Sequence, residues 1–186
     1  QSLFHPAIMR LREMIAEGTV GRVFYAHSTR LGFGFVRQDE GVLWSYASHD
    51  ITVLNFLLGG TPQDIVADGA CYLKPGLEDM AGFTLGYREG MKAHVFVSWL
   101  HPYRQHRLVV VGEEGMLVLD DAGAEAMVYH YKKAIRWEEE RVVVRDEGMR
   151  SFRFAQDSSL RAELEYFIGH LDKEIGVCDG RCAHET

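Results

Sequence analysis

The sequence predicts an α+β fold: a large, mostly antiparallel, open-faced sheet with helices on one side. Three observations predict it. Segments in which apolar and polar residues alternate fill the middle of the 186-residue chain, helical patterns bracket these segments, and short turns separate several of them. Runs of strands between helices are typical of α+β folds. The length suits one well-filled domain, so residues 1–186 are treated as a single unit.

The first helix is predicted to begin at Pro6, a residue that suits a first helical turn, and to end at Gly18. Its apolar stripe consists of Ile8, Leu11, Met14 and Ile15. The chain begins with Gln and enters this helix almost at once. We therefore expect the sequence to be a piece of something longer.

A second helix is predicted after Ser48, whose hydroxyl would cap it and place His49 and Asp50 at the first two helical positions. Gly59-Gly60 would end it. A third helix is predicted from Leu160 to Ile175. The buried stripes expected for these two helices are Ile51, Leu54, Leu57 and Leu58, and Leu160, Leu164, Phe167, Leu171 and Ile175.

Eight segments read as strands, either because their residues alternate between two faces or because β-branched and apolar residues dominate them. They are Arg22 to Leu31, Asp64–Leu73, Met80–Tyr87, Met91–Leu100, Arg107–Val111, Met116–Asp120, Met127–Tyr131 and Glu140–Arg145. Large side chains stand on both faces of the predicted sheet, among them Phe96, Tyr129 and Tyr131. Because the helices are too few to cover both faces, we expect a homodimer or tetramer formed through the sheet. The alternative is a monomer in which the second face of the sheet is exposed to solvent.

Composition excludes several partners. The net charge of −7 is spread along the chain without a run of Lys or Arg, so nucleic acid is not expected. Apolar runs fall far short of the ~20 residues of a membrane helix, and no secretory segment opens the chain. Three cysteines form no disulfide framework, and a cytoplasmic location is expected. Cys178, Cys182 and His184 could be a metal tract but lack a second ligand pair, so no metal is predicted.

His49 is the candidate for acid–base chemistry. At the N-terminus of the predicted helix its side chain can face a cleft. An imidazole pKa of about 6.5 lets it act as a general base near neutral pH. The alternative is a His that only bonds to a neighbouring loop. Gly32-Phe33-Gly34 begins like a dinucleotide motif but lacks the third Gly and opens no convincing helix. The sequence contains no nucleotide-binding motif that we recognise.

A series of short segments, in this order and at this spacing, resembles the C-terminal domain of the Gfo/Idh/MocA family of NAD(P)-dependent oxidoreductases. The segments are Glu17–Val23, Leu43-Trp44, His49–Ile51, Leu57–Gly59, Ser98–Pro102, Arg107–Gly112, Gly115-Met116, Asp120-Asp121 and Leu160–Glu163. Leu43-Trp44 and Ser98–Pro102 are most similar to members that act on nucleotide-linked sugars. The resemblance implies a dihydrodipicolinate reductase-like domain of the glyceraldehyde-3-phosphate dehydrogenase-like type.

The resemblance also implies a two-domain enzyme whose Rossmann domain holds NAD or NADP and supplies a catalytic Lys from a Glu-Lys-Pro motif. Neither is in this sequence, so no cofactor is expected to bind this chain alone, and the chain alone should be inactive. His49 matches the family's catalytic His. Many members carry Asp four residues earlier, where this chain has Ser45. That difference puts the role of the Asp in doubt.

Arg30, Arg37, Trp44 and Ser45 are the candidate substrate-binding residues. An Arg fork suits a diphosphate or a carboxylate, and Trp44 could stack on a ring. The alternatives are ordinary surface arginines and a buried Trp. Three further candidates follow the end of a predicted strand: His101, Tyr103 and Arg104. We expect the substrate-binding and oligomerisation half of a sugar or nucleotide-sugar dehydrogenase. The alternative is a non-catalytic binding or assembly module that dimerises through its sheet.

Overall fold

The computed structural model describes residues 1–34, 36–155, 159–173 and 176–177. One eight-stranded sheet dominates it, in the order β2-β3-β4-β1-β5-β6-β7-β8. All neighbouring strands are antiparallel except β1 and β4, which are parallel. The strands are β1 (Val23–Phe33), β2 (Asp64–Ala70), β3 (Met80–Gly86), β4 (Lys92–Ser98), β5 (Leu100–Gly112), β6 (Met116–Asp120), β7 (Glu125–Glu138) and β8 (Arg141–Ala155). The predicted α+β class with a mostly antiparallel sheet is confirmed.

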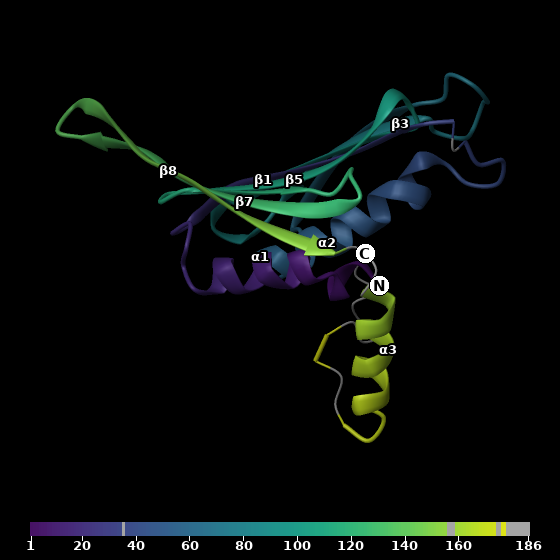
Figure 1. Ribbon diagram of the computed structural model, residues 1–186. Coiled ribbons are helices and arrows are strands. Elements are labelled where there is room, and N and C mark those ends of the chain that lie inside the picture. Colours follow the sequence, from purple (N-terminus) through teal and green to yellow (C-terminus); the bar gives the residue numbers. More distant parts are fainter. Residues whose placement is uncertain (35, 156–158, 174–175, 178–186) are drawn as a thin grey trace.

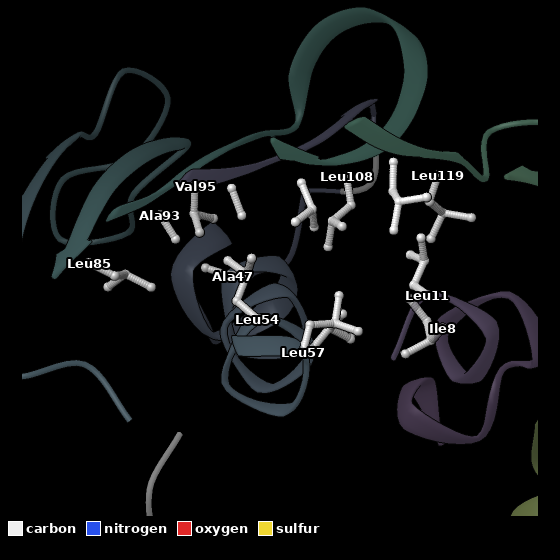
Figure 2. Close-up of a cluster of buried hydrophobic side chains, with 14 of the residues drawn as sticks. Ile8, Leu11, Ala47, Leu54, Leu57, Leu85, Ala93, Val95, Leu108 and Leu119 are labelled. Atoms are coloured by element: carbon white, nitrogen blue, oxygen red, sulfur yellow. The ribbon is translucent and has the colours of Figure 1, made fainter. Parts of the chain in front are cut away.

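Helices α1 (Pro6–Ala16) and α2 (Ser48–Leu58) lie on the same side of the sheet, and α3 (Ser159–Gly169) leads away from it (Figure 1). Three short helical segments complete the chain: η1 (Ser2–Phe4), the π-helix η2 (Leu43–Ala47) and η3 (Arg88–Gly90). The core fills the space between the sheet and the two helices, and Figure 2 shows Leu108 pointing into it from the sheet and Leu11 and Leu54 from the helices.

Among the residues that the structure describes, no helix lies over the opposite face of the sheet (Figure 1). Along β4, Ala93, Val95 and Val97 are buried against the helices, and Lys92, His94 and Phe96 alternate with them on the exposed side. This period of two is what a sheet with one covered face requires. The expected open face is therefore present.

The predicted cap of α2 is wrong. Ser48 is the first residue of α2 and does not cap it, because η2 runs directly into α2. The N-cap position is Ala47, which has helical backbone angles and makes no side-chain cap. The Ser48 hydroxyl instead donates back to the Trp44 carbonyl oxygen at 2.9 Å. His49 and Asp50 therefore stand inside a longer helical run whose wider π turn sets the direction in which they point.

Three predicted strands are too short. Arg107–Val111, Met127–Tyr131 and Glu140–Arg145 are the middles or ends of the much longer strands β5, β7 and β8. The prediction Met91–Leu100 also crosses a strand boundary, since β4 ends at Ser98 and β5 begins at Leu100. Charged residues interrupt the apolar alternation in β7 and β8, and cross-strand pairing extends these strands regardless of it.

The third helix is confirmed over Ser159–Gly169, but its apolar stripe is not buried in this chain. Leu160, Leu164, Phe167 and Leu171 are each more than half exposed, because α3 leaves the layer of helices that packs on the sheet (Figure 1). Ile175 lies outside the described residues, as do Cys178, Cys182 and His184.

No helix in the described part of the chain has the length and apolar composition needed to cross a membrane. Within the same ranges, no three side chains of His, Cys, Asp or Glu are grouped so that they could hold a metal ion.

Gly115 marks a close approach between the turn after β5 and strand β7. A Cβ atom there would lie 2.6 Å from the Tyr131 carbonyl oxygen, inside contact distance of backbone that cannot easily move. We expect Gly115→Ala to lower the free energy of unfolding by about 2 kcal/mol. Gly60→Ala is the matched control, because nothing lies within 4 Å of its added Cβ. Urea unfolding of both variants checks this, and equal stability of the two would contradict it.

Candidate functional site

The site is built on Asp50, whose side chain is almost completely buried between α2 and the sheet. Strand β1 brings Ser28 and Arg30 to the helix side of the sheet. The Ser28 hydroxyl donates to Asp50 Oδ1, and Arg30 Nε donates to Oδ2 at 2.5 Å. A buried carboxylate is costly unless it is paired and hydrogen-bonded, and here both conditions are met.

His106 joins this pair from β5, directly opposite Arg30 in the β1–β5 ladder. Its Nδ1 lies 3.0 Å from Asp121 Oδ2, and its Nε2 lies 2.9 Å from Arg30 Nη2. Because an arginine can only donate, Nε2 accepts from Arg30 when the ring is neutral, while Nδ1–H donates to Asp121. When the ring is protonated, Nε2–H faces Asp50 Oδ1, which lies 3.6 Å away. We call Ser28, Arg30, Asp50, His106 and Asp121 the charge cluster.

The charge cluster shifts the ionisation of its members. Burial alone would raise the pKa of Asp50, but the hydrogen bond from His106, the charge of Arg30 and the Ser28 hydroxyl outweigh it and bring the pKa to about 2. Burial and Arg30 oppose protonation of His106, yet its bonds to Asp121 and Asp50 raise its pKa above the ordinary value. Asp50 is therefore ionised throughout the physiological range.

His49 stands next to the charge cluster and is half-buried. Burial, followed by the nearby charge of Arg30, lowers the pKa of His49 below its ordinary value of 6.5, although Asp50 acts in the opposite direction. An imidazole with a lowered pKa is neutral at pH 7 and has a lone pair available for a proton. This is the form that a general base needs.

Two cavities meet at the charge cluster. The larger has a volume of about 750 Å³, and the smaller one of about 290 Å³ contains His49, Asp50 and Asp121 in its wall. Arg30 and His106 line both, so these two side chains form the boundary between them. The larger cavity is lined by Arg30–Gly34, Val36, Arg37, Ser45, Tyr46 and Pro102–His106.

The structure brings some predicted site residues together and leaves others apart. Arg30 is at the centre of the charge cluster, so the alternative of an ordinary surface arginine is wrong for it. Arg37 and Ser45 line the larger cavity, and Arg37 pairs with Glu40 at 3.0 Å. Trp44 is 69% exposed and stands apart from the residues that line the two cavities, so the alternative of a buried Trp is wrong.

The three candidates that follow a strand end differ in position. Tyr103 and Arg104 line the larger cavity, while the ring of His101 packs edge-on against Tyr103.

Four members of the charge cluster were not among the predicted site residues: Ser28, Asp50, His106 and Asp121. One signal was available, because Ser28 and Arg30 share the face of β1 that carries the apolar Ala26, and polar residues on a core face call for partners. His106 lies 76 positions after Arg30 in the sequence, and no comparable signal connected the two.

The described residues do not form a dinucleotide cradle. Such a cradle needs a Gly-rich turn that leads from a strand into the N-terminus of a helix. Helix α1 follows η1, α2 continues η2, and the Gly32-Phe33-Gly34 segment lies at the end of β1 in the wall of the larger cavity. NAD or NADP therefore does not fit this part of the chain by that mode, and no step is derived through it.

Comparison with solved structures supports the fold. UDP-N-acetylglucosamine 3-dehydrogenase GnnA from Acidithiobacillus ferrooxidans superposes with a TM-score of 0.75 at 23% identity, over 99% of this chain and 56% of that one. The WlbA dehydrogenase from Bordetella pertussis, solved in complex with NADH and UDP-GlcNAcA, gives a TM-score of 0.56 at 19% identity, over 63% of this chain and 40% of that one. These likenesses are at the level of the fold.

Sequence comparison gives the family. An uncharacterized oxidoreductase of Streptococcus pneumoniae is 24% identical over 135 residues, which are 63% of this chain and 36% of that protein. The chain thus matches only about a third of that relative and little more than half of the GnnA structure. Residues 8–118 match the GFO/IDH/MocA C-terminal domain. This match covers more than half of the sequence, and the chain belongs to the GFO/IDH/MocA C-terminal domain family.

Proposed function

We propose that this domain is the substrate-binding and oligomerisation half of an NAD- or NADP-dependent oxidoreductase that acts on a hydroxyl of a sugar or nucleotide sugar. One observation carries the proposal: a large cavity with arginines in its wall adjoins a small one that contains a neutral His49, and Arg30 and His106 form the boundary. A substrate anchored in the larger cavity can present one hydroxyl at that boundary.

The larger cavity suits a nucleotide sugar. Its volume falls in the usual range of about 300–1,000 Å³ for small-molecule sites. Arg37 and Arg104 offer the planar forks that bind phosphate oxygens, and the exposed rings of Phe33 and Tyr103 offer faces on which a base can stack. The UDP-linked compounds named for GnnA and WlbA agree with this substrate class.

His49 serves as the acid–base group. Oxidation of a carbinol requires the hydroxyl proton to leave as the hydride departs from carbon, and the neutral imidazole of His49 accepts that proton. Asp50, through Arg30 and His106, keeps the boundary between the cavities fixed. The nicotinamide cofactor is held outside residues 1–186, where the family resemblance places a Rossmann domain and a catalytic Lys.

The open face of the sheet packs against a second copy of the chain, giving a homodimer or a tetramer. Eight strands spaced at about 4.8 Å, each contributing about six residues, form a face of roughly 34 by 20 Å, or about 700 Å² per copy. That area is close to the roughly 800 Å² per partner of a standard interface. Tyr129, Tyr131 and Phe96 lie on this face and supply apolar contact area.

Removing the Arg37 side chain tests the substrate class. In the full-length protein, Arg37→Ala should raise the KM for a nucleotide sugar by about 10- to 100-fold, because a charge-assisted bond to phosphate contributes roughly 1.5–3 kcal/mol. The KM for the corresponding free sugar should hardly change. Arg141→Ala, an exposed arginine of β8, is the control. An equal KM for the nucleotide sugar in wild type and Arg37→Ala would overturn this assignment.

Ser45 supports a second candidate, a binding or assembly module without catalysis. It stands where many family members carry an Asp, so the chemistry could have been lost while the sheet contact was kept. Assays of the full-length protein with NAD⁺ and NADP⁺ distinguish the two candidates. Failure to reduce either cofactor with any sugar or nucleotide sugar, together with an intact oligomer, would favour the module.

A further inference from the structure

The outer halves of β7 and β8 form a two-stranded arm that extends beyond the rest of the sheet (Figure 1). We define the arm as residues 133–146, from the Lys133–Asp146 pair to the turn between the strands. Six paired residues along each strand give it a length of about 20 Å. An isolated two-stranded ribbon is only marginally stable in water, so its faces need a partner.

One face of the arm is apolar and open. Ile135 is paired with Val144, and Trp137 is paired with Val142, so the four side chains share one face. They are exposed by 67%, 68%, 76% and 51% in that order. Four large apolar side chains that are each more than half exposed make a contiguous patch, which is typical of an interaction surface.

The other face of the arm is polar and is held by the arm's own chain. Arg136 and Arg145 both bind the carboxylate of Glu114 in the β5–β6 turn, and the Arg145–Glu114 distance is 2.6 Å. These two ion pairs fix which way the arm faces. The apolar patch therefore points away from the chain's own body.

The apolar patch lies on the same side of the sheet as the open face. Between the pairs Tyr131–Met149 and Lys133–Asp146, β7 advances by two residues and β8 by three, so the extra residue belongs to β8. β7 keeps its two-residue period, which places Tyr129 and Tyr131 on the same face of the strand as Ile135 and Trp137. The Lys133–Asp146 ion pair lies between them on that face, so the open face and the patch are two neighbouring apolar areas on one side of the sheet.

We propose that the arm clasps a second copy of this chain, with Ile135, Trp137, Val142 and Val144 buried against it. The inference rests on the sheet contact of the proposed function and extends it. A second copy is the fitting partner because the patch lies on the same side of the sheet as the open face, whose area is close to that of a standard interface. When two identical faces pack together, an arm that projects past the sheet can lie against the other copy.

Two valine-to-lysine substitutions distinguish a contact made by the patch from a general effect of a new charge in the arm. In the full-length protein, Val144→Lys places a charge in the patch, and we expect the dissociation constant of the oligomer to rise at least about 10-fold. Val143→Lys is the matched control, because Val143 lies on the opposite, polar face. Sedimentation equilibrium measures both. An unchanged dissociation constant for Val144→Lys, or a monomeric wild-type protein, would overturn the proposal.

A crosslink identifies the partner of the arm. A photoreactive benzoylphenylalanine at position 137, in a mixture of copies labelled with ¹⁴N and ¹⁵N, should give crosslinks between light and heavy peptides. Crosslinks confined to one isotope would show that the arm folds back on its own chain and would overturn the proposal. Tyr129→Lys tests the sheet contact alone. If Tyr129→Lys dissociates the oligomer and Val144→Lys does not, the sheet contact stands and the arm has no part in it.

Discussion

The His49→Asn variant of the full-length protein is expected to turn over its substrate about 10²–10⁴-fold more slowly than wild type, the usual contribution of a general acid–base group. Asn keeps the polarity and roughly the size of the side chain but cannot take the hydroxyl proton. His49 is half-buried and outside the charge cluster's direct bonds, so the melting temperature should change little.

The pH dependence gives a second signature of His49. A base works only when deprotonated, so kcat/KM should be constant above the pKa of His49 and should fall as pH drops below it. Burial and Arg30 lower that pKa, so the fall should occur below pH 6.5 and should be absent in His49→Asn.

His170→Asn, just after the end of α3, is the control for a histidine replacement remote from the cavities. Wild-type turnover in His49→Asn with the true substrate would remove His49 from the mechanism. A small loss of stability with normal turnover would support the alternative of a His bonded to a loop.

Replacing Asp50 should have the largest effect on stability. Asp50→Asn removes the negative charge that Arg30 and His106 face, and we expect it to lower the free energy of unfolding by about 3 kcal/mol. Removing one partner of a buried ion pair leaves the other charge uncompensated. Asp146→Asn is the control, because that carboxylate is exposed and pairs with Lys133 at the surface. Its loss should cost far less than that of Asp50, because an exposed ion pair contributes little to stability.

Acid unfolding tests the same carboxylate through its pKa. The pKa of Asp50 is about 2 in the folded chain, against an ordinary value of 3.8. A group with a depressed folded pKa stabilises the fold above its unfolded pKa, and the stabilisation is lost as pH falls from about 4 toward 2. The difference corresponds to about 2 kcal/mol. In urea unfolding across this range, the free energy of unfolding should fall less in Asp50→Asn than in wild type. An equal fall in both proteins would contradict the role of Asp50.

The alternation of residues was enough to predict the sheet and its open face. Ala93, Val95 and Val97 alternate with polar or exposed residues along β4, and this local pattern survives in the folded chain because only one face of the sheet is covered. The length of the arm was not predicted, because that prediction also relied on alternation. Charged residues interrupt the apolar pattern in the arm, and pairing between β7 and β8 extends the strands there.

The charge cluster was only partly predictable. Arg30 was predicted as a site residue, and Asp50 was placed beside the candidate base His49 without a role of its own. His106 and Asp121 join them through the pairing of β1 with β5, and one sequence contains no signal for contacts between strands so far apart. The third helix shows a similar limit. A period of 3.6 predicts an apolar stripe on α3, but it does not say what the stripe contacts.

Transfer of deuterium tests the proposed function most directly. The full-length protein is incubated with NAD⁺ or NADP⁺ and a nucleotide sugar that carries deuterium on its carbinol carbons, and the cofactor is analysed by mass spectrometry. We predict deuterium in the reduced nicotinamide, at a rate that falls about 10²–10⁴-fold in His49→Asn. Binding of the nucleotide sugar without reduction of either cofactor, or reduced cofactor without deuterium, would contradict hydride transfer from a sugar carbon.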